Sequence, residues 1–245
     1  NLRDHPKVYV TWEINPGYPV EARPARGGAC LRYTAPGSNW RNDLSINMGA
    51  FVTARVPWAE ASSSSQDDAS AARRYVEMML ALLLPVSRGE LRLLSPDPQV
   101  QPGLDYNYLA DPFDRQRLRA CVRLALTLVE HDDLKEIIGP LREPAAPELA
   151  SDAALDAWLL RQATTYSHIS GTCKMGPGTD PMAVVDQSGL VHGLEGLRIV
   201  DASIMNGAAI GSITGGAGSD TLALTGGMTL DLTSGSGRPV ITGIE

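Results

Sequence analysis

The chain has 245 residues, of which 43% are hydrophobic and 20% are charged, and its formal net charge is −7. This composition is globular, and the length suits one large domain or two small ones with a sizeable core. The net acidity and the lack of a lysine and arginine run exclude an electrostatic nucleic-acid surface. No apolar run reaches the about eighteen residues that a transmembrane helix needs. We therefore expect no nucleic-acid partner, no membrane span and a cytoplasmic location.

Alternation of apolar and polar residues predicts the first three strands, over residues 8–14, 31–35 and 44–52. In the third strand Leu44, Ile46 and Met48 should share one face. The apolar run 75–84 that follows fits a strand or a helix, because periodicity alone cannot separate the two. The turn at 87–89 and the residues after it favour a hairpin, with strands at 76–84 and 90–94 in the same sheet.

Helix signals dominate the next part of the chain. Asp111-Pro112 starts a helix over 112–130, whose apolar stripe includes Leu118, Cys121 and Val122 and whose arginines form a mostly solvated face. A short helix at 133–138 should stop at Gly139-Pro140, and Ser151 should cap a third helix, with Leu155, Trp158 and Leu159 buried. Strands followed by helices predict an α+β fold: a mostly antiparallel sheet with helices packed on one face, followed by a glycine-rich β-like tail.

The stretch from Tyr166 to Met205 contains the residues with the most chemical interest. His168 lies in a loop of small residues, and two apolar runs, 183–186 and 197–200, fit short strands. The second run has a buried-strand pattern and ends at Asp201, where open sheets commonly bind ligands. A lone histidine in a loop is more often structural than catalytic, so His168 by itself decides nothing.

Five segments together resemble the glucose–methanol–choline (GMC) family of flavin-dependent oxidoreductases. The C-terminal signature of that family is matched by HISGTCKMG at 168–176, DPMAVVD at 180–186 and VHGLEGLRIVDASIM at 191–205. NLRDHP at 1–6 and PVSRGELRLLSPDP at 85–98 resemble two further family segments. On local chemistry alone, the first of these two is a polar loop before a strand.

The resemblance implies that residues 1–205 form the substrate-binding domain of an FAD-dependent enzyme that oxidises a small-molecule alcohol. His168 would accept the proton of the alcohol while hydride passes to the flavin, a role that suits an imidazole. Asp201, Ala202 and His5 would contact the cofactor. The family's GxGxxG segment is missing, so we expect a fragment without its flavin-binding half, inactive as an isolated chain.

The composition changes after residue 205, and the last forty residues contain ten of the 24 glycines. Gly215–Leu222 is similar to one calcium-binding RTX repeat, but such repeats bind calcium between stacked turns. A glycine-rich β tail without metal is the favoured interpretation of 206–245. The departure from the family pattern indicates a fusion at about residue 206.

Two other functions remain open at this point. A calcium-dependent extracellular repeat module would make the tail the active part and residues 1–205 a relic. A metal-dependent hydrolase would use His168 and Asp180, but no HExxH motif or paired histidine spacing supports a metal site. The three cysteines, Cys30, Cys121 and Cys173, are odd in number and far apart, and they are expected to be free thiols.

Overall fold

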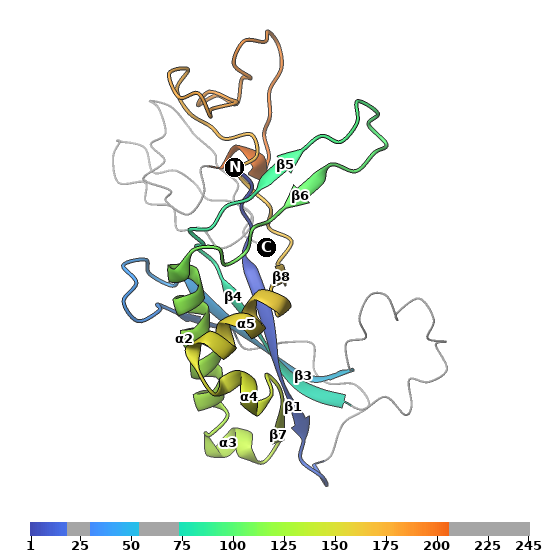
Figure 1. Ribbon diagram of the computed structural model, residues 1–245, viewed down its shortest axis with the longest axis vertical. Helices are drawn as coiled ribbons and strands as arrows, with labels where there is room; N and C mark the ends of the chain where they lie inside the picture. The colour runs from blue at the N-terminus through green and yellow to red at the C-terminus, as the bar shows by residue number, and fades with distance from the viewer. Residues whose placement is uncertain (19–29, 54–73, 206–245) are drawn as a thin grey trace, which may run out of the picture. The chain divides into compact units, whose positions relative to one another are not determined.

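The structure is a computed structural model that describes residues 1–18, 30–53 and 74–205 (Figure 1). The chain divides into two compact units. The sheet unit consists of Pro6–Leu82 and Tyr108–Tyr166, and the loop unit consists of Asn1–His5, Leu83–Asn107 and the residues from Ser167 onward. Each unit therefore combines segments that are far apart in the sequence.

In the described part of the sheet unit, six strands form one antiparallel sheet in the order β2-β3-β4-β1-β7, and β8 also pairs with β1. The strands are β1 (Pro6–Ile14), β2 (Cys30–Tyr33), β3 (Leu44–Thr53), β4 (Arg74–Leu82), β7 (Ile138–Glu143) and β8 (Thr164–Thr165). Leu44, Ile46 and Met48 lie opposite Leu82, Leu80 and Met78. The predicted alternation in β3 is therefore confirmed, because these side chains share the face that packs into the core.

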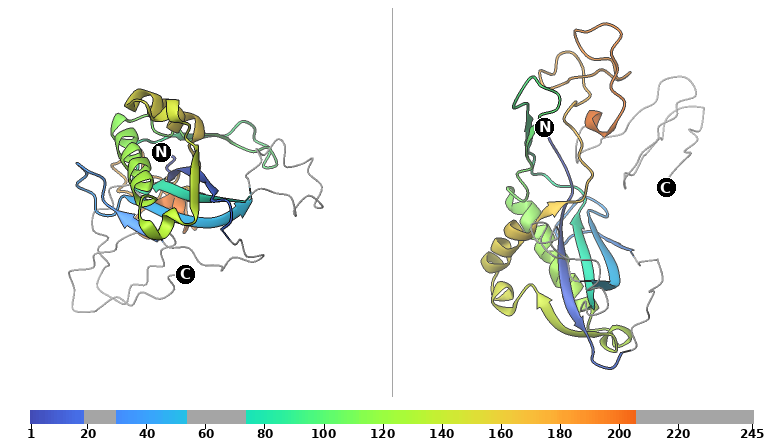
Figure 2. Two further views of the ribbon diagram at one scale, coloured as in Figure 1. Left: turned by 90° about the horizontal axis from the view of Figure 1, so that it is seen from below. Right: turned by 90° about the vertical axis from the view of Figure 1, so that its right-hand side faces the viewer.

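Helices α2 (Pro112–Leu128) and α5 (Asp152–Gln162) cover one face of this sheet (Figures 1 and 2). The Asp111 carboxylate accepts the Phe113 N–H at 2.8 Å and caps α2, as the Asp-Pro signal predicted. Ser151 caps α5. Trp158 and Leu159 of α5 are buried against the same core as Leu118 of α2. The fold is α+β, as expected.

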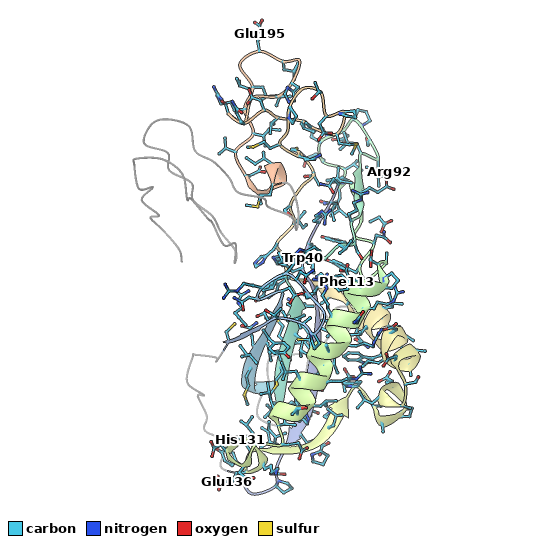
Figure 3. The ribbon with its side chains drawn as sticks, turned by 90° about the vertical axis from the view of Figure 1, so that its left-hand side faces the viewer. Trp40, Arg92, Phe113, His131, Glu136 and Glu195 are labelled. Atoms are coloured by element: carbon cyan, nitrogen blue, oxygen red, sulfur yellow. The ribbon has the colours of Figure 1, made fainter. Side chains whose placement is uncertain are left out.

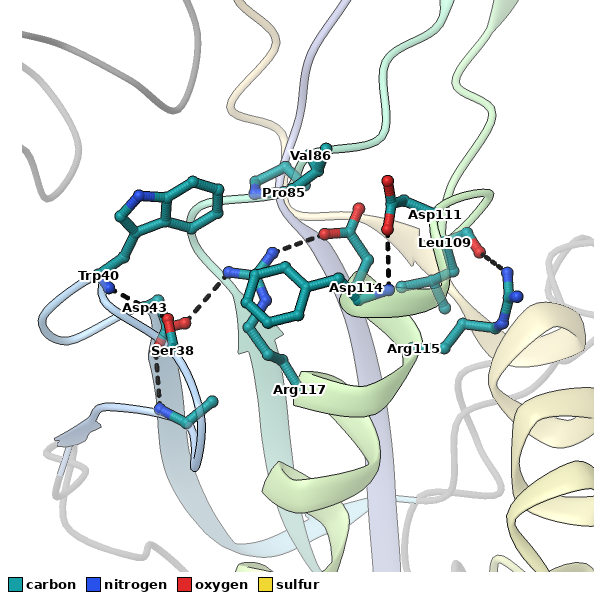
Figure 4. Close-up of polar contacts among 12 residues, drawn as sticks. Ser38, Trp40, Asp43, Pro85, Val86, Leu109, Asp111, Asp114, Arg115 and Arg117 are labelled. Atoms are coloured by element: carbon teal, nitrogen blue, oxygen red, sulfur yellow. Dashed lines mark hydrogen bonds and ion pairs between the residues drawn. The ribbon is translucent and has the colours of Figure 1, made fainter.

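The arginine face of α2 is not the solvated face that the sequence indicated. Arg117 is completely buried and donates to Asp43 at 3.1 Å and to Asp114 at 2.6 Å (Figure 4). Its guanidinium also lies 4.9 Å from the Trp40 ring and 4.3 Å from the Phe113 ring. These two rings, whose residues are labelled in Figure 3, meet edge to face with their centroids 5.9 Å apart. Charge on this helix therefore neutralises buried carboxylates, which a composition pattern cannot reveal.

Three further arginines of α2 pair with α5, and Arg115 is the first of them, with its Nε 3.4 Å from Asp156 Oδ2. Arg119 makes ion pairs with Asp152 and Asp156, and Arg123 pairs with Asp152. These contacts join the two helices on the side away from the sheet core. Only Arg123 among these arginines is more than half exposed.

The prediction for 133–138 needs a second correction. Helix α3 covers only Asp132–Lys135, and the chain then enters β7, which contains Gly139 and Pro140 and pairs with β1. Strand β7 lies at the edge of the sheet in the described residues, with register shifts along its pairing, so proline is tolerated there. A further short helix, α4 (Ala146–Leu149), leads to α5.

In the loop unit, β5 (Glu90–Arg92) pairs with β6 (Gly103–Asp105) as a separate two-stranded sheet. The prediction that 90–94 joins the main sheet as a hairpin with 76–84 is therefore wrong. The strand forms, but its partner comes later in the chain. Leu93 and Leu94, at the end of this predicted strand, are exposed.

The prediction of two short strands near the end of the described chain is also wrong. Within 183–186 only Val185 makes strand-like bridges, to Met175 and Val191, and within 197–200 only Arg198 does, to Leu190, so neither run forms a strand. Leu197 is 47% exposed and Val200 is 81% exposed, which contradicts the buried-strand pattern. An apolar run therefore does not by itself show that its side chains are buried.

The tail from 206, with Gly215–Leu222, lies outside the described residues. No helix within 1–18, 30–53 and 74–205 has both the length and the apolar character needed to cross a bilayer.

Candidate active site

The N-terminal residues of the loop unit lie between two loops that are distant in sequence. Leu2 exchanges two backbone hydrogen bonds with Gly89, of 2.9 and 2.8 Å. The next residue, Arg3, exchanges two with Ser170, also of 2.9 and 2.8 Å, and its guanidinium donates to the Pro85 carbonyl at 2.9 Å. The segments 1–5, 85–89 and 168–171 are therefore joined, and each belongs to a motif singled out in the sequence.

This arrangement brings His5 and His168 together. Their ring centroids are 5.2 Å apart and the ring planes are inclined by 83°, an edge-to-face contact. His168 lies in a loop, as predicted, and is exposed, whereas His5 is half-buried. The His168 ring is therefore open to solvent, where a small molecule can reach it.

The carboxylate of Asp4 connects the two histidines through their main chains. Its Oδ1 accepts the His5 N–H at 2.8 Å and the His168 N–H at 3.0 Å. Asp4 is only 5% exposed. Asp4 was not among the predicted site residues, and the one signal for it in the sequence is its place directly before His5 in the NLRDHP segment.

The two remaining predicted site residues, Asp201 and Ala202, lie beside the same loop. The N–H groups of Gly171, Cys173 and Met175 donate to the carbonyls of three consecutive residues, Ala202, Ser203 and Ile204. Those three residues form the turn η2 (Ala202–Ile204). The structure thus places the loop of His168 directly against the segment that contains Asp201 and Ala202.

Gly171 makes this close approach possible. Its φ is +80°, and a Cβ at this position would lie 2.8 Å from the Asn1 carbonyl oxygen and 3.3 Å from that of Met205. Only glycine avoids both the left-handed strain and the collision. Glycine is therefore required at this position of the HISGT segment, because the N-terminal segment crosses the chain there.

Asp201 is an exposed carboxylate that caps η2. It accepts hydrogen bonds from Ser203, including the Ser203 N–H at 2.8 Å, and these bonds hold the pKa of Asp201 below its usual range. The carboxylate is therefore negatively charged at neutral pH.

Asp180, the partner of His168 in the hydrolase hypothesis, belongs to a different set of contacts. It pairs with Lys174 and accepts the Met182 N–H at 2.9 Å. Among the described residues, no group of three or more His, Cys, Asp or Glu side chains could hold a metal ion. This geometry gives the hydrolase hypothesis no support.

A family model described as GMC oxidoreductase matches residues 85–216, which is more than half of the chain. The chain belongs to the GMC oxidoreductase family. The matched range contains the 85–89 loop, His168, Asp201 and Ala202. Most of the candidate site of this GMC protein therefore lies within the residues that match the family.

Relatives of this GMC protein include two bacterial enzymes. The oxygen-dependent choline dehydrogenase 1 of Chromohalobacter salexigens is 32% identical over 87% of this chain and 40% of its own length. The oxygen-dependent choline dehydrogenase of Paraburkholderia xenovorans shows the same identity and coverage. The chain thus spans about 40% of the length of these curated relatives.

Solved structures of two oxidases resemble this one. Pyridoxine 4-oxidase from Mesorbium loti has a TM-score of 0.64 at 26% identity, with 83% of this chain and 38% of that chain covered. A formate oxidase from Aspergillus oryzae has a TM-score of 0.66 at 19% identity, over 84% of this chain and 42% of that chain, which shows a shared fold alone.

Proposed function

We propose that this chain is the substrate-binding part of an FAD-dependent oxidoreductase that oxidises the CH–OH group of a small alcohol. The observation that supports it most is the position of His168. Its imidazole is exposed, its backbone N–H donates to the buried Asp4, and its ring contacts His5. Family membership supplies the reaction class. Residues 1–205 would have this function, and the tail 206–245 would lie outside it.

In the proposed reaction His168 is the catalytic base. A ring nitrogen of His168 accepts the proton of the substrate hydroxyl, and the carbon that bears this oxygen becomes a carbonyl carbon as its hydride leaves. FAD, when bound, supplies the acceptor for that hydride. The residues of this chain hold the base in place and take the proton.

The proposed flavin contacts are based on the exposed apolar and polar groups of the loop unit. A flavin ring needs apolar cover for its faces and polar groups for its edges. Ile169, next to His168, is 38% exposed and Val200, next to Asp201, is 81% exposed. Together with Asp201, Ala202 and His5, these residues are the ones we propose to contact FAD.

The substrate class is proposed from the relatives. Two of them are named choline dehydrogenases and one solved relative is named pyridoxine 4-oxidase, and these names refer to small molecules. A small alcohol is therefore the proposed substrate of the whole enzyme.

A chimaera tests the assignment of His168. Residues 1–205 would be joined to the flavin-binding half and the C-terminal end of a choline dehydrogenase relative, and alcohol-dependent turnover would be measured. His168→Ala should reduce the rate by roughly 10²–10⁴, the usual contribution of a positioned base. His192→Ala is the control, because this exposed histidine contacts the Gly176 carbonyl in the same unit. Equal turnover in the His168 variant and its parent would refute the assignment.

A second measurement concerns FAD binding by this chain alone. We expect the 245-residue chain to lose added FAD on gel filtration, because it has no GxGxxG segment to hold the ADP part. The chimaera should keep it. A yellow 245-residue chain after gel filtration would contradict this expectation.

A further inference from the structure

We infer that Asp4 is a positioning residue that sets the backbone of both histidines in the candidate site. This inference deepens the proposed function and depends on it for its catalytic meaning. It starts from one geometric relationship: a single oxygen, Asp4 Oδ1, accepts the N–H of His5 at 2.8 Å and the N–H of His168 at 3.0 Å. Those two donors are separated by 163 positions in the sequence, from 5 to 168.

Burial makes these two hydrogen bonds strong. Asp4 is 5% exposed, so water competes weakly for its carboxylate. Hydrogen bonds from backbone N–H groups to an ionised oxygen are stronger than those between neutral groups. The carboxylate therefore fixes two main-chain positions more firmly than a neutral side chain of the same shape.

The donors in these two bonds are backbone N–H groups, which matters for the chemistry. Asp4 can hold both residues in place through these two bonds whether or not either ring carries a proton. The rings of His5 and His168 remain in edge-to-face contact at 5.2 Å. A catalytic base must keep its position while it gains and loses a proton, and this attachment allows that.

Neighbouring contacts support the same role. Arg3, directly before Asp4, is held on its backbone by Ser170 and on its side chain by the Pro85 carbonyl. The main chain on which Asp4 sits is thus anchored at the preceding residue. An anchored carboxylate transmits its position to His168, whereas a mobile one would not.

Amide hydrogen exchange in the 245-residue chain tests the attachment without any activity. Asp4→Ala should speed exchange of the His5 and His168 N–H groups by about tenfold or more. The Leu2 and Gly89 N–H groups, which bond to each other's carbonyls, should keep their protection. Asp4→Asn keeps one acceptor oxygen and should give an intermediate result. Unchanged exchange at His168, or equal loss of protection throughout the loop unit, would overturn the inference.

A matched control is available in the same unit. Asp186 Oδ1 also accepts two backbone N–H groups, those of Ser188 at 2.8 Å and Leu190 at 2.9 Å. Asp186→Ala should speed exchange at Ser188 and Leu190 and leave His168 unchanged. If Asp186→Ala sped exchange of the His168 N–H as much as Asp4→Ala does, the effect would be a general loosening of the unit and the inference would fail.

Turnover of the chimaera separates this inference from the proposed function. Asp4→Asn should lower kcat by about tenfold with little change in KM, because a small displacement of a base costs rate. In the His168→Ala background the same change should have no further effect. An additive loss would overturn the positioning role. Full activity of His168→Ala would instead refute the proposed function, while the exchange result for Asp4 would still stand.

Discussion

The Arg117 guanidinium donates to Asp43 Oδ2 over 3.1 Å, and neither side chain has any exposed surface (Figure 4). Asp43 also accepts the Ala35 N–H at 2.8 Å, so the pair ties the turn between β2 and β3 to helix α2. Arg117→Met should lower the free energy of unfolding of the sheet unit by about 3–5 kcal/mol, because two buried carboxylates would lose their counter-charge. Urea unfolding followed by tryptophan fluorescence measures this.

The control for that prediction is a surface ion pair on the same helix. Arg123 pairs with Asp152, and both side chains are more than half exposed. Arg123→Ala should leave the free energy of unfolding almost unchanged, because solvent screens an exposed ion pair. Similar losses in the two variants would show that burial does not govern the strength of these pairs.

Gly89 should not accept a side chain. A Cβ there would lie 1.8 Å from the carbonyl oxygen of Asp105, a backbone atom that cannot move without shifting β6. Gly89→Ala should therefore destabilise the loop unit by about 1–3 kcal/mol and speed hydrogen exchange in peptides from 83–107. Gly103→Ala is the control in the same hairpin, because its Cβ would meet only the flexible Leu94 side chain at 3.3 Å. Equal exchange in both variants would contradict the steric argument.

The cysteines should differ in reactivity. Burial raises the pKa of the Cys121 thiol in α2 well above its usual range, so little thiolate forms and reagents cannot reach it. Cys30 is exposed. Iodoacetamide at pH 8 should modify Cys30 first and Cys121 only after unfolding in urea, as peptide mass spectrometry would show. Rapid modification of Cys121 in the native protein would contradict its burial.

Acid should break the contact between Lys174 and Asp180. The hydrogen bond from Lys174, and next that from the Met182 N–H, hold the pKa of Asp180 below its usual value of 3.8. Because this pKa is lowered on folding, the stabilisation is fully present above pH 3.8 and is lost as the pH falls through the folded-state value. Lys174→Met should raise the Asp180 pKa toward 3.8, as measured by carboxyl carbon NMR.

Asp201 serves as the internal reference in the same titration. Its pKa is lowered by Ser203 and not by a lysine. The Lys174 change should therefore leave the Asp201 titration where it was. A shift of both carboxylates would indicate a general structural change, and the pairwise explanation would be wrong.

Local patterns predicted four strands of the main sheet, of which β1, β2 and β3 were indicated by short-range alternation, but they did not predict β7 or β8. Leu44, Ile46 and Met48 point into the core as expected, and Asp111 and Ser151 cap their helices. Pairing was harder to predict. The strand at Glu90–Arg92 forms where expected, but it pairs with Gly103–Asp105, because alternation identifies a strand and does not choose its partner.

The candidate site was predicted only as separate pieces. Motifs indicated His5, His168 and Asp201, but their spacing gave no reason to place the first two rings in contact. The decisive link, Asp4, accepts the N–H of His168, and a bond between residues 164 positions apart leaves no local pattern of residue types in the sequence. Arg117 was misjudged for a related reason, since its partner Asp43 lies 74 positions away.

The chain passes between the sheet unit and the loop unit four times, at His5–Pro6, Leu82–Leu83, Asn107–Tyr108 and Tyr166–Ser167. Two of these passages lie close to one strand pair, because Pro6 of β1, at the first passage, pairs with Thr165 of β8, the residue before Tyr166. Neither unit is therefore encoded by one continuous stretch of the gene. A recombination event that replaced either unit would have to match four junctions at once, so the sheet and the histidine-bearing loops should be inherited as a single block.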